Sequence, residues 1–150
     1  MNELVSIILL QNRDLNKFKD FIRIFRYQTY TNYKVFISLK NNNLYSDINL
    51  YLEQLNDNRF KIIYKSLKNN KDIFNYIINL NGEYFTILSD LDCVFQDHLK
   101  ILIGDYDLSY SKFNLLNGKD VNYKYENHVD LYNNYKGIKS FMWKLSFLFP

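Results

Sequence analysis

The chain has 150 residues, a length that suits one domain with a sizeable core and is short for two. Hydrophobic residues make up 47% and charged residues 23% of the chain, which excludes an intrinsically disordered protein, and aromatic residues reach 18%. The net charge of +3 comes without a basic tract, which argues against nucleic-acid binding. We therefore expect residues 1–150 to form a single domain with a core rich in aromatic rings.

The cysteine content and the N-terminus bear on the cell compartment. Cys93 is the single cysteine of the chain, so an intramolecular disulfide and a cysteine metal cluster are both excluded. We interpret this residue as a small buried thiol. The first ten residues carry an acid where a signal peptide has positive charge, and their apolar run is far shorter than the ~20 residues of a membrane span. The sequence predicts a cytoplasmic protein.

The first half of the chain alternates between strand and helix patterns. Residues 4–10 are a continuous apolar run, typical of a strand buried on both faces, and residues 33–39 are a second such run. Between them, from Asp14 to residue 25, apolar residues recur at steps of three and four, which predicts an amphipathic helix. Ser46 is expected to cap a second helix, which residues 56–58 stop before a strand over 60–65.

The alternation continues through a third helix, which begins at Asn70 or Asp72 and ends at Asn81-Gly82, where glycine would provide a left-handed cap. A strand over residues 84–88, a short helix near 97–103, a strand within 106–120 and an alternating strand from 141 complete the pattern. This order predicts an α/β fold, a doubly wound and mostly parallel sheet with helices on both faces and ligands at the carboxyl ends of its strands.

The pair of acids that follows the strand over 84–88 is the main candidate for chemistry. Asp90 and Asp92 are separated by one residue, and residues i and i+2 of an extended chain point the same way. Paired carboxylates are hard oxygen ligands suited to Mg²⁺ or Mn²⁺, which can neutralise a diphosphate. From the pair alone, a solvated turn in which an aspartate caps the next helix is the competing interpretation.

Four stretches of the chain, in their order and spacing, resemble family 2 glycosyltransferases of the GT-A fold. They are VSIILLQNRD, QTYTNYKVFIS, RFKIIY and GEYFTILSDLDCVFQDHLKIL. The resemblance covers residues 4–103 as the nucleotide-binding half, and residues 104–150 less specifically as a partial acceptor-side region. It implies that Asp90 and Asp92 bind the divalent metal, Mn²⁺ or Mg²⁺, that holds the diphosphate of a nucleotide-sugar donor.

The resemblance also suggests where the nucleotide would lie. The backbone at Leu10, Gln11 and Asn12, the Lys40 side chain and Asp90 are the candidate contacts. Lys65 and Lys68 are further candidate partners of phosphate or ribose, although a solvated surface charge is the competing interpretation of every lysine. The implied function is transfer of a sugar, with inversion, to a glycan or lipid-linked acceptor.

Within these 150 residues no general base is assigned, since the resemblance indicates a chain that is short at its C-terminal end. An alternative therefore stays open, that of a truncated or degenerate relative without catalysis that acts as a binding or partner subunit. His98 is interpreted as a surface residue, and Trp143 as a core aromatic in preference to a platform for the acceptor sugar.

We expect the apolar stretch over residues 141–150 to be buried in a contact, because large apolar patches are seldom left in water. Self-association or a peripheral contact with the inner face of a membrane would provide one.

Overall fold

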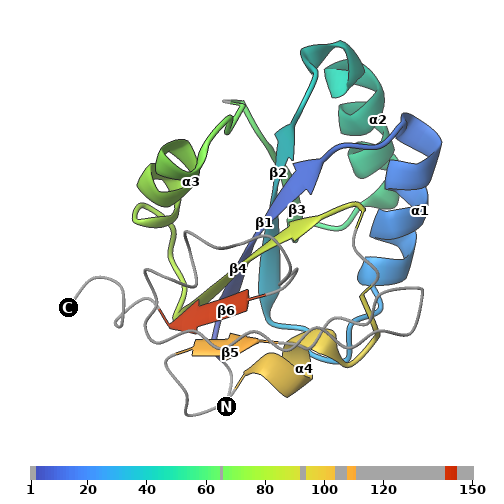
Figure 1. Cartoon of the computed structure of the whole chain (residues 1–150). Coiled ribbons are helices and arrows are strands. Elements are labelled where there is room, and N and C mark those ends of the chain that lie inside the picture. Colours follow the sequence, from blue (N-terminus) through green and yellow to red (C-terminus); the bar gives the residue numbers. More distant parts are fainter. Residues whose placement is uncertain (1–2, 65, 92–93, 104–107, 111–140, 145–150) are drawn as a thin grey trace, which may run out of the picture.

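The computed structural model describes residues 3–64, 66–91, 94–103, 108–110 and 141–144, and its centre is a six-stranded sheet (Figure 1). Four parallel strands form one side of the sheet in the order β3-β2-β1-β4, and β6 and β5 extend it in antiparallel pairing beyond β4. The strands are β1 (Val5–Gln11), β2 (Tyr33–Leu39), β3 (Phe60–Ile63), β4 (Tyr84–Ser89), β5 (Leu108–Tyr110) and β6 (Phe141–Lys144).

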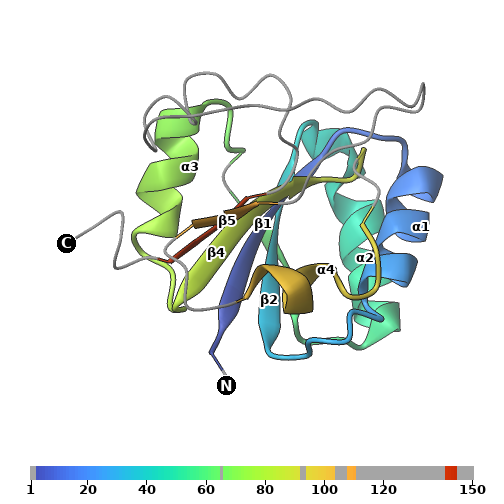
Figure 2. The same ribbon diagram turned by 60° about the horizontal axis from the view of Figure 1, so that its bottom comes forward.

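Helices cover both faces of the sheet (Figure 2). The helices α1 (Leu15–Phe25), α2 (Tyr45–Leu55) and α4 (His98–Leu102) contribute to one core cluster, whereas α3 (Asn70–Ile77) packs on the opposite face. A short 3-10 helix, η1 (Asn42–Leu44), precedes α2. The predicted doubly wound, mostly parallel sheet with helices on both faces is confirmed.

The side chains of β1 explain why most of its sequence is apolar. Val5, Ile7 and Leu9 point into the cluster under α1, α2 and α4, whereas Ile8 points into the cluster under α3. All four are fully buried. A strand that is central in a two-sided sheet favours apolar residues on both faces, since successive side chains alternate between two dry environments.

The helix ends agree only partly with the sequence prediction. The first predicted helix is present as α1, and Asp14 caps it, because its Oδ1 accepts a hydrogen bond of 3.1 Å from the Lys17 N–H. Ser46 was the wrong choice for α2, which begins one residue earlier as a continuation of η1, with Leu44 at the cap position and no side-chain cap. The chain enters α2 directly from the 3-10 helix η1, so this helix begins without a capping hydroxyl.

The third helix is shorter than predicted. It is capped by Asn69 and ends at Ile77, four residues before the expected stop at Asn81-Gly82. Gly82 has φ +155°, a conformation that other residues rarely adopt, and it lies two residues before β4 instead of closing the helix. A Cβ at this position would lie 2.8 Å from the Ser6 Oγ and 3.0 Å from the Leu4 carbonyl oxygen, so both the backbone conformation and the close approach of the chain before β1 favour glycine.

An aromatic cluster joins α1 to β2 and β3. The Tyr33 ring meets the Phe25 and Phe60 rings edge to face, at centroid distances of 5.6 and 6.3 Å. The Arg59 guanidinium lies 4.5 Å from the Tyr33 ring centroid and pairs with Asp57 at 2.6 Å. Tyr33 is 2% exposed, and this burial raises the pKa of its hydroxyl to about 12.

The C-terminal part of the chain contributes two short strands. The predicted strands within 106–120 and from 141 are present as β5 and β6, and the rest of residues 104–150, with the expected turn at 117–118, lies outside the described residues. The proposed contact through 141–150 and the single-domain organisation therefore stay predictions. Among the described residues, no helix is long and apolar enough to cross a bilayer.

Candidate nucleotide-binding site

The candidate site lies at the carboxyl end of the sheet, where β1 stands between β2 and β4. The chain leaves β1 through α1 to reach β2 on one side, whereas β4 arrives on the other side after two further crossovers. Such a reversal of strand order lets the two loops at the carboxyl ends diverge, and open α/β sheets bind ligands in the crevice between them. Here those loops follow Gln11 and Ser89.

Asp90 joins these two loops. Its carboxylate is 2% exposed, and its Oδ1 and Oδ2 accept hydrogen bonds from the backbone N–H groups of Asn12 and Arg13, both at 2.9 Å. The Asp90 N–H in turn donates to the Leu10 carbonyl at 3.3 Å. The charge of Asp90 is therefore balanced by two amide dipoles of the β1–α1 loop, a pattern that holds an ionised carboxylate in a nearly dry place.

Further bonds fix the same two loops. The Asn12 Nδ2 donates to the Ser89 Oγ at 3.0 Å and to the Leu10 carbonyl at 3.1 Å. The Ser89 Oγ also accepts from the Leu91 N–H at 3.2 Å. Segments that are nearly 80 residues apart in sequence thus form one hydrogen-bonded unit, which is preorganised before any ligand arrives.

Gln11 connects β1 to β2 at this edge. It is 4% exposed, its Oε1 accepts from the Lys40 N–H at 3.2 Å, and its Nε2 donates to the Arg13 carbonyl. Lys40 itself is exposed, whereas the preceding Leu39 is 3% exposed and belongs to the core cluster. Lys40 therefore extends from a rigid backbone at the rim of the sheet.

Arg13 is a residue of this edge that the sequence analysis did not select. It lies half-buried on the β1–α1 loop, and no ion pair within the described ranges involves its guanidinium. Its position two residues after the end of a buried strand was the signal that could have identified it. With Lys40, it gives the rim two cations, which suits an anionic ligand.

The structure therefore brings together the predicted residues Leu10, Gln11, Asn12, Lys40 and Asp90 at one edge of the sheet. Asp92, Cys93 and Lys65 lie outside the described residues. Within the described part of the chain there is no group of three or more His, Cys, Asp or Glu side chains arranged for a metal ion. The metal and nucleotide roles stay predictions.

His98 is less exposed than the sequence suggested. It begins α4 and is half-buried, and this burial lowers the pKa of its imidazole. Lys68 is exposed and lies between β3 and α3, where its N–H donates to the Asp72 carboxylate at 3.3 Å.

The Gln-Thr turn before β2 has a structural role that the sequence alone did not reveal. Gln28 is 4% exposed, its Nε2 donates to the Phe95 carbonyl at 2.6 Å, and its Oε1 accepts from the Leu99 N–H at 3.1 Å. Thr29 adds a bond of 2.8 Å from its hydroxyl to Asp97. This turn therefore holds α4 and the segment that follows the acidic pair against α1.

No protein-family model and no curated protein matches the chain. Among solved structures, it is similar to a mannosyltransferase from Pyrobaculum calidifontis in complex with GDP-Man and Mn²⁺, with a TM-score of 0.62 and 11% identity over 97% of this chain and 46% of that chain. The fold is GT-A-like.

A second similar structure is the 4-diphosphocytidyl-2C-methyl-D-erythritol synthase from Anaerococcus prevotii DSM 20548, with a TM-score of 0.63 and 9% identity over 99% of this chain and 74% of that chain. The GT-A-like chain spans less than half the length of the mannosyltransferase, and at these identities the likeness concerns the fold alone.

Proposed function

We propose that this chain binds the diphosphate of a nucleotide-sugar donor at the carboxyl edge of β1 and β4, and that it transfers the sugar to a glycan or lipid-linked acceptor. One observation carries the proposal. At the point where the strand order reverses, the Asp90 carboxylate bonds the loop after β4 to the loop after β1. Two cations of this rim, Arg13 and Lys40, would neutralise phosphate oxygens.

A divalent cation fits the proposal through Asp90 and Asp92. Mg²⁺ is commonly held by one or two carboxylates together with substrate phosphates and water, so a full cage of protein ligands is not needed. Each oxygen of Asp90 accepts one amide hydrogen bond, and a carboxylate oxygen has room for a second interaction. When bound, the ion would neutralise the leaving diphosphate, while the residues of the loop orient it.

A second function is favoured by the burial of Asp90. Because both of its oxygens already hold the β1–α1 loop, the residue can be retained for loop geometry alone. The chain would then bind a nucleotide diphosphate, or a complete transferase, without turnover. This alternative requires the edge and its cations but no general base.

Isothermal titration calorimetry with UDP and GDP, each with and without Mn²⁺, tests donor binding. Replacing Arg13→Ala or Lys40→Ala should weaken binding by roughly 10- to 100-fold, the effect of losing one charge-assisted hydrogen bond of about 1.5–3 kcal/mol. Lys34→Ala is the matched control, since Lys34 is an exposed lysine at the opposite end of β2.

The absence of heat with either diphosphate under all conditions would remove the proposal. Release of nucleoside diphosphate from UDP- and GDP-sugars then separates the two functions, since only the transferase turns its donor over. Binding without release supports the second function.

A further inference from the structure

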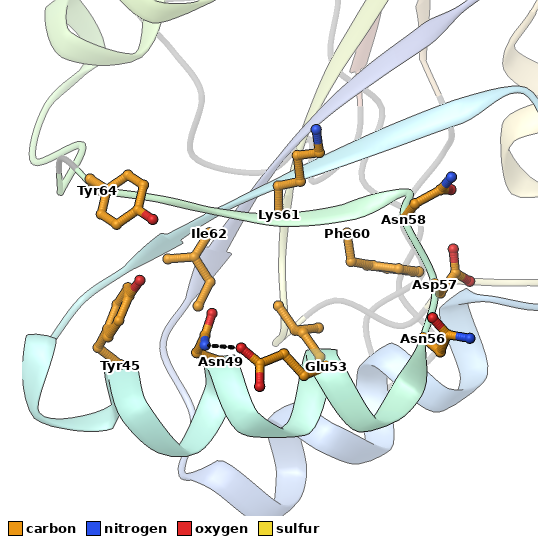
Figure 3. A pocket seen from close by; sticks show the side chains of 11 residues that line it. Tyr45, Asn49, Glu53, Asn56, Asp57, Asn58, Phe60, Lys61, Ile62 and Tyr64 are labelled. Atoms are coloured by element: carbon orange, nitrogen blue, oxygen red, sulfur yellow. Dashed lines mark hydrogen bonds between the residues drawn. The ribbon is translucent and has the colours of Figure 1, made fainter.

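A groove runs along the outer edge of the sheet, between α2 and β3 (Figure 3). Its volume is about 530 Å³, within the range of about 300–1,000 Å³ that is common for small-molecule sites. None of its residues belongs to the rim formed by the loops after β1 and β4. Its lining consists of tyrosines, amides and charged side chains over an apolar floor: Tyr45, Asn49, Leu52, Glu53, Asn56, Asp57, Asn58, Phe60, Lys61, Ile62 and Tyr64.

A pair of polar residues on α2 lies in the middle of this groove. Asn49 and Glu53 are one turn apart, and the Asn49 Nδ2 donates to the Glu53 Oε1 at 2.7 Å (Figure 3). This bond uses one of the two amide hydrogens and one of the two carboxylate oxygens. The second amide hydrogen of Asn49 and the second carboxylate oxygen of Glu53 thus offer a donor and an acceptor side by side, which matches adjacent hydroxyl groups on a ligand.

Two tyrosines form one end of the groove. The rings of Tyr45 and Tyr64 have their centroids 6.0 Å apart, and Tyr64 is 88% exposed although it directly follows the edge strand (Figure 3). The neighbouring Tyr64 side chain raises the pKa of the Tyr45 hydroxyl, which agrees with the proximity of the two rings. An exposed flat ring beside a groove offers apolar surface together with a polar tip.

The charges of the groove favour a neutral ligand. The Asp57 carboxylate is already paired with Arg59 at 2.6 Å, which leaves Glu53 and Lys61 with opposite signs. The edge strand itself is four residues long and carries the exposed Lys61, two features that protect sheet edges against pairing with an added peptide strand. A ligand with many hydroxyls and an apolar ring face fits this lining better than an extended peptide.

We infer that the groove between α2 and β3 binds a neutral oligosaccharide, which stacks one sugar ring on Tyr64 and donates and accepts hydroxyl hydrogen bonds at Asn49 and Glu53. This site lies on other residues than the diphosphate site proposed above. It would hold a glycan chain on the protein whether or not the chain transfers a sugar.

The test is an amide chemical-shift titration of the ¹⁵N-labelled chain with four neutral probes: maltotetraose, cellotetraose, chitotetraose and mannotetraose. At least one probe should give saturable shifts that concentrate on residues 45–64. Tyr64→Ala should weaken that binding about tenfold, because it removes the stacking surface from a side chain too exposed to matter for folding.

Glu53→Gln and Asn49→Ala should each weaken the same binding, since they change the polar pair on an exposed helix face. Tyr27→Ala is the matched control, because Tyr27 is a 64% exposed tyrosine that does not line the groove. A lack of saturable shifts with all four probes, or equal affinity for the Tyr64→Ala and Tyr27→Ala variants, overturns the inference. Since the proposed diphosphate site lies on other residues, the result is independent of donor binding.

Discussion

Replacing Asp90 by asparagine should destabilise the protein far more than the same replacement of a surface aspartate would. The substitution keeps the size of the side chain but removes its charge and turns one oxygen into an NH₂ group. That group would face one of the two backbone N–H donors, of Asn12 or Arg13, that the carboxylate now accepts at 2.9 Å. One hydrogen bond is lost, and the other is weakened to a neutral one.

The magnitude follows from these two bonds. A hydrogen bond to a charged acceptor contributes about 1.5–3 kcal/mol and a neutral one about 1 kcal/mol, and a buried donor without a partner costs about 1–3 kcal/mol. Removing the charge of a side chain that is 2% exposed recovers part of its desolvation cost. We expect Asp90→Asn to lower the free energy of unfolding by about 2 kcal/mol, and the amide hydrogens of Asn12 and Arg13 to exchange faster.

Urea denaturation followed by circular dichroism measures this change, with Asp20→Asn as the matched control. Asp20 pairs with Arg23 at 2.7 Å on the surface of α1, where its side chain is 58% exposed, so its loss should cost less than about 1 kcal/mol. If both variants unfold at the same urea concentration, the assignment of Asp90 as the anchor of the β1–α1 loop is refuted.

Three further predictions concern stability. Burial raises the pKa of the Tyr33 hydroxyl to about 12 in the folded state, against 10.0 when unfolded. The protonated hydroxyl therefore contributes about 2–3 kcal/mol to the free energy of unfolding below pH 10, and this contribution is lost between pH 10 and 12. The urea midpoints at pH 9 and pH 11 should differ less in Tyr33→Phe than in the wild type. Gln28→Ala should cost about 2 kcal/mol in the same assay, because it removes two bonds to the segment around α4, whereas exposed Gln54→Ala should cost less than about 0.5 kcal/mol, and equal costs would contradict the role of Gln28. Gly82→Ala should lower the thermal midpoint by several degrees, since its Cβ meets backbone and the Ser6 hydroxyl at φ +155°, and an unchanged midpoint would show that β1 yields there.

The strands could be predicted from the sequence because the sheet is buried on two sides. Where both faces are dry, a strand such as β1 is apolar at most of its positions, and such runs are visible without any knowledge of their partners. Helix ends were predicted less well, since they depend on local alternatives of similar energy. A 3-10 turn replaced Ser46 as the start of α2, and α3 stopped at Ile77 before the glycine that the pattern suggested.

The candidate site was predictable in its location but not in its contacts. A strand pattern that ends in acids places Asp90 at the carboxyl edge, which needs only the order of elements along the chain. That its oxygens meet the amides of Asn12 and Arg13 depends on pairing across 77 or 78 residues, which no periodicity encodes. The place of Arg13 at the rim and the two Gln28 hydrogen bonds to the segment around α4 were missed for the same reason. Ordinary polar residues acquire such roles only from the tertiary arrangement.

The place of β1 between β2 and β4 has a consequence for synthesis on the ribosome. The unit of β1, β2 and β3 is built from sequential crossovers and can assemble while the chain is still emerging. Until residues 84–89 leave the exit tunnel, however, the other edge of β1 has no partner along the register from Val5 to Leu10. During that interval a mostly apolar strand of the nascent chain exposes its backbone to intermolecular pairing, so the timing of β4 release should govern the yield of folded protein.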